Sequence, residues 1–325
     1  MSHAPSASST PAAEPVALPA RRRRRRDARI GRGAVPYLLL APAVAVIGAV
    51  LAYPLYLLGS LSFQQYGLFE LIRHDGRWIG VDNYSTILRD SQFVDVLLRT
   101  IVFTAACVTL TMVFGTLIAL LLAQLGSFMR LLLTTGLVLV WAMPVVVAVN
   151  IWIWMFDFEF GVVNYVLTEL HLGDHVHHDW FENSLTGFAI IGAVVVWGAI
   201  PFVAITLFAG LTQVPKELVE AAALDGAGPA RIFRDITLPI LKPIFIILAS
   251  LSIIWDFQVF NQVWIARGGQ PAEEYFLIAV YAFVESFRIQ QYGLGSAIAV
   301  LMVAIMLVVT FFYIREMVRI GEVKR

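Results

Sequence analysis

Long stretches without any charged residue are the feature that most constrains this chain. Five stretches contain no charged residue: 34–69, 100–129, 131–156, 183–215 and 289–314. A sixth apolar run, 243–265, contains one charge, Asp256. Each is longer than the roughly 20 residues that an α-helix needs to cross a bilayer. A backbone in lipid must satisfy its own hydrogen bonds, and none of the runs alternates as a barrel strand does. The sequence therefore predicts an all-α membrane protein with six transmembrane helices, at about 35–62, 96–124, 131–155, 187–212, 243–265 and 292–314.

The composition and the placement of positive charge support this class. Only 14% of the residues are charged and 59% are hydrophobic, whereas about 25% of an average soluble chain is charged. If the N-terminus is placed in the cytoplasm, most of the 23 Lys and Arg residues fall on inside segments, as the positive-inside rule requires. Both termini and residues 213–242 are then cytoplasmic. The outside segments hold the smaller set: Arg73, Arg77, Arg89, Arg99, Arg267 and Arg288.

The two ends of the chain are predicted to be cytoplasmic tails, at 1–33 and 320–325. Residues 1–20 are rich in Ala, Ser and Pro, a composition that predicts disorder. Arginine fills positions 21–26. We interpret this run as a topology signal that keeps the tail inside, rather than as a nucleic-acid or anionic-lipid site. The expected environment is therefore a lipid bilayer, with no nucleic-acid partner.

A polar segment at 220–243 separates two apolar runs. Glu220 and Asp225 flank three alanines, a surface too flat and small to hold a substrate. Gly226 permits a turn with positive φ, and Pro229 suits the first turn of a second short helix. The prolines at 239 and 243 are expected to end that helix. Two short helices around a glycine turn predict a surface that another protein binds.

This segment resembles the EAA loop of ABC-transporter permeases, the membrane subunits of binding-protein-dependent importers. The resemblance implies a MetI-like permease core at 34–319, whose cytoplasmic loop 213–243 couples the helices to an ATPase. The coupling residues that it implies are Glu220, Ala221, Ala222, Asp225, Gly226, Ala227, Phe233, Ile236, Leu238 and Pro239.

The chain carries no ATP-hydrolysing motif of its own. A phosphate-binding loop ends in Gly-Lys-Ser/Thr, and none of the three lysines, Lys216, Lys242 and Lys324, follows a glycine. We therefore expect no enzymatic activity and no cofactor in this chain, with ATP and Mg bound by a separate ATPase subunit.

Further motifs resemble those of the maltose-type, or carbohydrate-uptake-1, permeases from about residue 36 onward. They are Trp78 to Tyr84 in the first outside loop, Gly161 to Asn164, the lead-in Gly210 to Glu217, and Gly268-Gly269 with Pro271, where Gln270 interrupts the family pattern. The resemblance implies a sugar importer of the plasma membrane. It also implies a second homologous permease, two copies of an ABC ATPase and an extracellular sugar-binding lipoprotein.

The fifth predicted span mixes aromatic and polar residues, which suits sugars because they present both hydroxyl groups and flat C–H faces. Asp256 is a functional candidate because an ionisable group inside a span is costly. A structural hydrogen bond between helices is the competing interpretation. The full set of candidates for the substrate path is Trp255, Asp256, Gln258, Asn261, Gln262, Asn150 and Trp197. The tract resembles permeases for chitobiose or cellobiose.

Other interpretations of the sequence concern a metal site, the cargo and the class of transporter. His171, His175, His177 and His178 have a spacing that can ligate zinc, but they lie in a polar outside loop, so we predict no metal site. The cargo could instead be a polyol or glycerol phosphate. From another class, a stand-alone secondary transporter would need no EAA-like loop. The single cysteine, Cys107, lies in the second span and forms no intrachain disulfide.

Overall fold

The computed structural model describes residues 29–323. The predicted tails lie partly outside it, but residues 29–33 already belong to the first helix, α1 (Arg29–Ser62), and residues 320–323 still belong to the last helix, α14 (Tyr292–Val323). Contacts divide the chain into a unit up to Leu55 and a second unit from Tyr56 onward. In the first unit, helix α1 is long and apolar enough to cross a membrane from Leu39 onward.

The second unit is a bundle of long apolar helices, and this confirms the all-α fold class. Its long helices are α4 (Ser91–Gln124), α8 (Ser184–Leu211), α11 (Leu238–Phe257) and α14 (Tyr292–Val323). With α1, five described helical runs are long enough to span a membrane, and a sixth span results if one bent pair counts as one.

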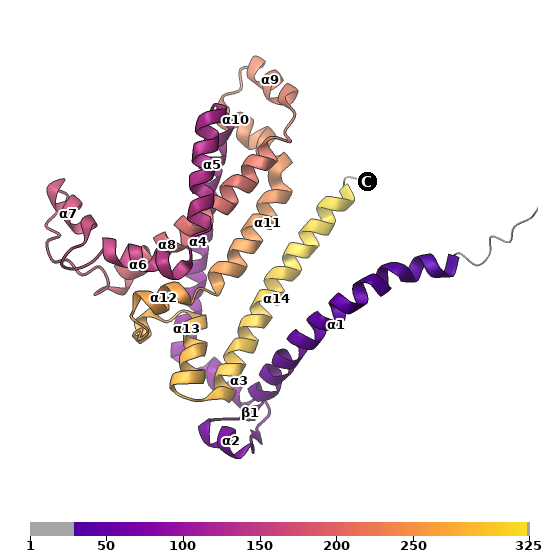
Figure 1. The fold of residues 1–325 in the computed structure, drawn as a ribbon, viewed down its shortest axis with the longest axis vertical. Helices are drawn as coiled ribbons and strands as arrows, with labels where there is room; N and C mark the ends of the chain where they lie inside the picture. The colour runs from indigo at the N-terminus through magenta and orange to yellow at the C-terminus, as the bar shows by residue number, and fades with distance from the viewer. Residues whose placement is uncertain (1–28, 324–325) are drawn as a thin grey trace, which may run out of the picture. The chain divides into compact units, whose positions relative to one another are not determined.

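The bent pair corrects the third predicted span. The expected helix 131–155 is divided into α5 (Ser127–Trp141) and α6 (Val145–Met155), whose axes differ by 98°. Pro144 explains the break, because it has no N–H to continue the helix and disfavours helical geometry at the residue before it. Its own ψ of 133° is extended. The α6 segment consequently runs across the direction of α5 (Figure 1) and packs against α12 (Asn261–Ala266).

The fifth span also differs from the prediction at both ends. Instead of stopping near Pro239, α10 (Pro229–Ile232) continues through a π-helical turn, η1 (Phe233–Thr237), directly into α11. The wide π turn leads into the first turn of α11, which contains Pro239. A proline in a first helical turn costs little, because its missing N–H is not needed there. At the other end α11 stops at Phe257, so the predicted span to 265 is interrupted before α12 begins.

Helices α4, α8 and α11 pack against one another and form the centre of the bundle (Figure 1). A Cβ added at Gly115 of α4 would lie 2.5 Å from the Val203 side chain of α8, so glycine is what permits this close approach. Buried residues toward the end of the bundle that carries α9 (Lys216–Leu224) include Ala119, Leu207 and Leu248. A larger cluster at the other ends is centred on Tyr275, Leu277 and Ile278.

Short elements close the end of the bundle opposite to α9 (Lys216–Leu224). They are β1 (Gln64–Gln65), α2 (Leu68–Arg73), β2 (Arg77–Trp78), α3 (Asp82–Arg89), η2 (Glu273–Tyr275), α13 (Ile278–Phe283) and η3 (Val284–Arg288). Helix α7 (Val162–Glu169) follows α6 and lies at the side of the bundle (Figure 1). Strands β1 and β2 pair antiparallel, with Gln64 opposite Trp78.

The asparagines of two sequence motifs each hold a different loop in place. Asn83 is buried and donates to the backbone oxygens of Ser62 and Gln64, both at 2.9 Å. Asn164 is also buried; it donates to the backbone oxygen of His178 at 3.1 Å and accepts from the Trp180 indole N–H at 2.5 Å. Both asparagines therefore have structural partners.

Candidate functional site

The predicted coupling segment is an exposed arm built around a glycine turn. Gly226 has φ of 81°, the left-handed region that glycine adopts without strain. Its N–H donates to the Ala223 oxygen at 3.1 Å, and the Ala227 N–H donates to the Ala222 oxygen at 2.9 Å. These two bonds are the Schellman arrangement that ends a helix and satisfies its last carbonyls. The turn therefore fixes how the chain leaves α9.

The surface of α9 is almost entirely open. None of its residues is buried, and the Leu224 side chain is 89% exposed. Glu220, Ala221 and Asp225 are exposed, and Glu220 forms no ion pair with the described residues. An exposed leucine beside small alanines and a free carboxylate is suited to contact with another protein.

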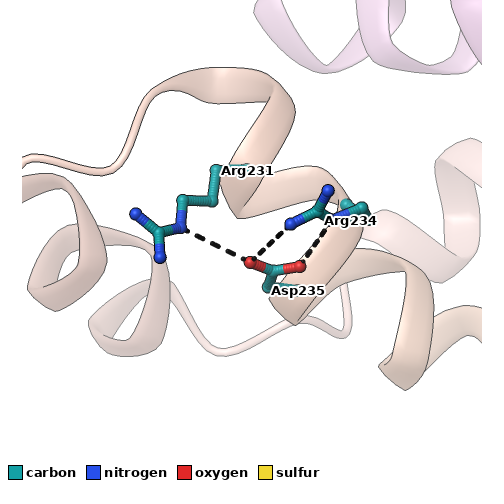
Figure 2. Close-up of polar contacts among 3 residues, drawn as sticks. All are labelled: Arg231, Arg234 and Asp235. Carbon is teal, nitrogen blue, oxygen red and sulfur yellow. Dashed lines mark hydrogen bonds and ion pairs between the residues drawn. The ribbon is translucent and has the colours of Figure 1, made fainter.

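The second half of the arm presents a small charged cluster, shown in Figure 2. Asp235 accepts from the Arg234 Nε at 2.8 Å, and the Arg231 Nε lies 3.6 Å from its other oxygen. All three side chains are largely exposed, so solvent screens the pairs and their net stabilisation is small. The main result is one positive charge in excess on this face. The apolar motif residues of this half, Phe233, Ile236 and Leu238, are half-buried, whereas Pro239 is exposed.

A second candidate site is a cavity of about 250 Å³ within the bundle, where α5 bends into α6 and α11 ends. It brings together four of the predicted path residues, Trp197, Trp255, Asp256 and Gln262. Phe202 of α8 links two of the indoles: its ring stacks on Trp141 at 6.4 Å and meets Trp255 edge-on at 5.3 Å. Aromatic faces therefore line the cavity beside a carboxylate and an amide.

Three predicted path residues do not reach this cavity. Asn150 and Gln258 are exposed, and each donates to the backbone oxygen four residues earlier in its own helix, at 2.7 and 3.0 Å. Asn261 is exposed at the start of α12. Conversely, Trp141 lines the cavity and was not predicted. The sequence signal that could have identified Trp141 is its position three residues before Pro144, at the end of a helix.

Asp256 is the ionisable group of the cavity, and only 3% of its surface is exposed. Its Oδ2 atom has no hydrogen-bond partner among the residues that the structure describes. A buried acceptor without a donor is costly, so the carboxylate is available to a hydroxyl-bearing solute. Recognition of a sugar ring requires a hydrogen-bond acceptor for its hydroxyl groups and flat aromatic rings for its C–H faces.

The histidines of the loop between α6 and α8 are engaged in aromatic packing. His175 and His178 lie against the Trp180 indole, with ring centroids 5.5 and 4.7 Å away, and His177 lies 5.3 Å from Phe158. Within residues 29–323 no three His, Cys, Asp or Glu side chains converge as a bound metal ion requires. The geometry therefore gives the zinc interpretation no support.

A bundle of helices long and apolar enough to span a membrane, with a carboxylate and an amide in the lining of a cavity and an exposed arm at one end, is typical of a membrane transport subunit. Residues 111–317 match the model of the family described as the binding-protein-dependent transport system inner membrane component. The chain belongs to this family. It is thus a multi-pass permease subunit of a binding-protein-dependent ABC importer, which excludes the stand-alone secondary transporter.

Two relatives and one solved structure show the extent of the similarity. The chain is 45% identical over 287 residues, 88% of each chain, to the diacetylchitobiose uptake system permease protein DasB of Streptomyces coelicolor. It is 33% identical over 286 residues, 88% of this chain and 91% of the relative, to the sulfoquinovosyl glycerol transport system permease protein SmoG of Agrobacterium fabrum. The fold matches a crystal structure of a bacterial ABC transporter involved in the import of alginate, with a TM-score of 0.75, 21% identity, and coverage of 90% of this chain and 97% of that chain.

Proposed function

We propose that this chain forms half of the membrane passage of a sugar importer, and that its cargo is a β-linked disaccharide of the chitobiose or cellobiose type. The observation that carries the proposal is the cavity at the end of α11, where Asp256 and Gln262 lie among three indoles. The 45% identical relative, a diacetylchitobiose uptake system permease protein, supports the same substrate class.

The cavity suits a neutral sugar better than a phosphorylated one. Sugar hydroxyls can donate to Asp256 and exchange hydrogen bonds with Gln262, while the C–H face of the ring lies on an indole. A glycerol phosphate would require cationic groups to balance its charge. Among the described residues, neither Lys nor Arg lines this cavity. The lining therefore favours an uncharged, hydroxyl-rich cargo over glycerol phosphate.

The cavity is incomplete within one chain. Trp141 and Trp255 line it, yet 59% and 48% of their surfaces are exposed. Large exposed aromatic surface next to a ligand cavity is typical of an interface. A second homologous permease on this side would enclose the cavity and complete the passage. An extracellular sugar-binding lipoprotein would deliver the cargo from the outside.

The exposed arm is the proposed contact with the ATPase subunit. One copy of a cytoplasmic ABC ATPase would receive α9, with Glu220 paired to one of its basic groups, and a second copy would serve the other permease. ATP and Mg would bind to these ATPases. In this arrangement both termini and the arm are cytoplasmic. Closure of the ATPase pair would move the arm and bias the helices between two passage states.

Reconstitution of the complete importer in proteoliposomes tests the proposal. We expect ATP-dependent uptake of radiolabelled diacetylchitobiose or cellobiose, and no uptake without the ATPase or the binding protein. Excess unlabelled glycerol phosphate should not compete. Uptake of glycerol phosphate in preference to either disaccharide would overturn the assignment of the cargo. Uptake by this chain alone, without ATP, would overturn the assignment of the partners.

A further inference from the structure

Another cavity, here called the α4–α8 groove, lies between two long helices and differs in character from the cavity at Asp256. Its volume is about 450 Å³, and none of the described side chains that line it carries a charge. Phe103 and Cys107 in its lining are buried, whereas Ala106, Leu110 and Ala189 are exposed. One side of the groove is therefore open, and its lining suits an apolar occupant.

The α4–α8 groove is bounded at both ends. At one end the rings of Phe103 and Phe188 lie 5.6 Å apart. The other end is at Phe114, and directly beyond it α4 and α8 touch, because a Cβ added at Gly115 would lie 2.5 Å from the Val203 side chain. From Phe103 to Phe114 the helix rises about 17 Å, at about 1.5 Å per residue. This length is comparable to half of the roughly 30 Å hydrocarbon core of a bilayer, the depth of one leaflet.

Helix α8 separates the groove from the Asp256 cavity. Its groove residues include Ala189, Ala193 and Val196. Its cavity residues include Val195 and Gly198. Each set repeats every three or four residues, as one face of a helix does, and the cavity set is displaced by two residues from the groove set. At about 100° per residue this displacement turns one set away from the other. The groove and the cavity therefore lie on opposite sides of α8.

The surroundings of the groove follow from this placement. Its walls, α4 and α8, are both long and apolar enough to cross a membrane. The proposed second permease covers the cavity side of α8, so the groove on the other side faces the hydrocarbon of the bilayer. Apolar cavities exclude water and take apolar ligands, and an empty void forfeits dispersion contacts along its lining. A lipid tail is the apolar molecule that is present at this depth.

We propose that the α4–α8 groove is a lipid-binding site that holds one acyl chain of a membrane phospholipid. The two helices enclose the chain and the ends of the groove limit its length, so it exchanges more slowly than lipid on the open surface. Trp197 lines both the groove and the Asp256 cavity, and the bound chain therefore supports one residue of the cavity wall from the lipid side. The assignment of the groove to the lipid side rests on the proposed passage, whereas the fit of the chain rests on the lining and the length.

Photolabelling of the complete importer tests the site. The importer is reconstituted with phosphatidylglycerol that carries a diazirine in its acyl chain, extracted into detergent, washed free of unbound lipid and irradiated. Mass spectrometry then maps the insertion sites. We expect insertion in residues 103–114 and 188–200, and at least tenfold less at Leu98, which is 59% exposed on α4 but does not line the groove. Absence of lipid from both groove segments, or equal insertion at Leu98, would overturn the inference.

Substitutions that fill the groove provide the matched comparison. Ala106→Phe on α4 and Ala189→Phe on α8 each place a ring in the groove, and both positions are exposed, so the core need not repack. We expect insertion in the groove segments to fall at least tenfold in each variant, at an unchanged yield of the complex. Ala105→Phe is the control, because Ala105 is an exposed neighbour outside the groove lining, and its labelling should stay within twofold of wild type. Full labelling in both test variants, or an equal loss in the control, would contradict the site.

The two proposals fail in different ways. If the wild-type importer takes up neither disaccharide, the assignment of the cargo fails, although the photolabelling still decides whether the groove holds lipid. If uptake is normal but the groove segments stay unlabelled, the sugar passage stands and the lipid site is wrong.

Discussion

Pro229 and Asp256 lie near opposite ends of one continuous helical run, Pro229–Phe257, which includes the π turn η1. At about 1.5 Å per residue the two residues are about 40 Å apart along the helix, comparable to the thickness of a bilayer with its headgroups. One end emerges from the exposed arm and the other borders the cavity. A displacement of the arm would therefore be carried to the carboxylate along one unbroken helical run, with the π turn and Pro243 as the points where it can bend.

The glycine turn of the arm gives the first prediction. In Gly226→Ala the left-handed φ is strained by about 1 kcal/mol or more, so the chain leaves α9 in another direction. We expect uptake to fall at least fivefold while the amount of protein in the membrane is unchanged. Gly228→Ala is the control, because Gly228 has φ of −73° and open space around it. Equal uptake by the two variants would show that the turn geometry is irrelevant to coupling.

The second prediction concerns the charge on α9. Glu220→Lys reverses a free, exposed carboxylate, and we expect both uptake and co-purification of the ATPase to be lost. Glu217→Lys, one turn earlier on the same exposed helix, controls for net charge and should retain most of both. Loss of ATPase binding in both variants would indicate general repulsion in place of a specific pair.

The third prediction separates the two interpretations of Asp256. Asp256→Leu removes a buried carboxylate that has an unpaired oxygen, so we expect an unfolding midpoint equal to or above that of the wild type, together with at least tenfold lower uptake. A structural hydrogen bond between helices predicts the opposite for stability. A lower midpoint, measured by thermal unfolding in detergent, would therefore assign Asp256 a structural role.

The fourth prediction addresses the loop between α6 and α8. Asn164→Leu leaves the Trp180 indole N–H and two backbone oxygens without their partner, which should cost about 2–4 kcal/mol. We expect the unfolding midpoint to fall by several degrees. Asn150→Leu serves as the comparison, since Asn150 is exposed and bonded to its own helix. Similar midpoints for the two variants would contradict the bracing role of Asn164.

The long helices were predictable because apolar runs without charge leave no other structure in lipid, and the turn at Gly226 was predictable because few other residues end a helix with positive φ. The breaks in the helices were not predictable. Pro144 ends a helix, whereas Pro243 is accommodated inside α11, and local sequence does not distinguish these outcomes, since neighbouring helices decide them. The cavity was predicted only in part because Trp141 reaches it through the 98° bend.

The hydrogen bonds of Asn83 and Asn164 have a consequence for how such permeases diversify. Both side chains form hydrogen bonds with backbone oxygens or with an indole. Neither amide is therefore free to form a hydrogen bond with a solute. The signatures that they mark therefore reflect how two loops are braced. A sequence that carries both signatures indicates this architecture, whereas its solute has to be inferred from other positions, such as the Pro144 break and the end of α11.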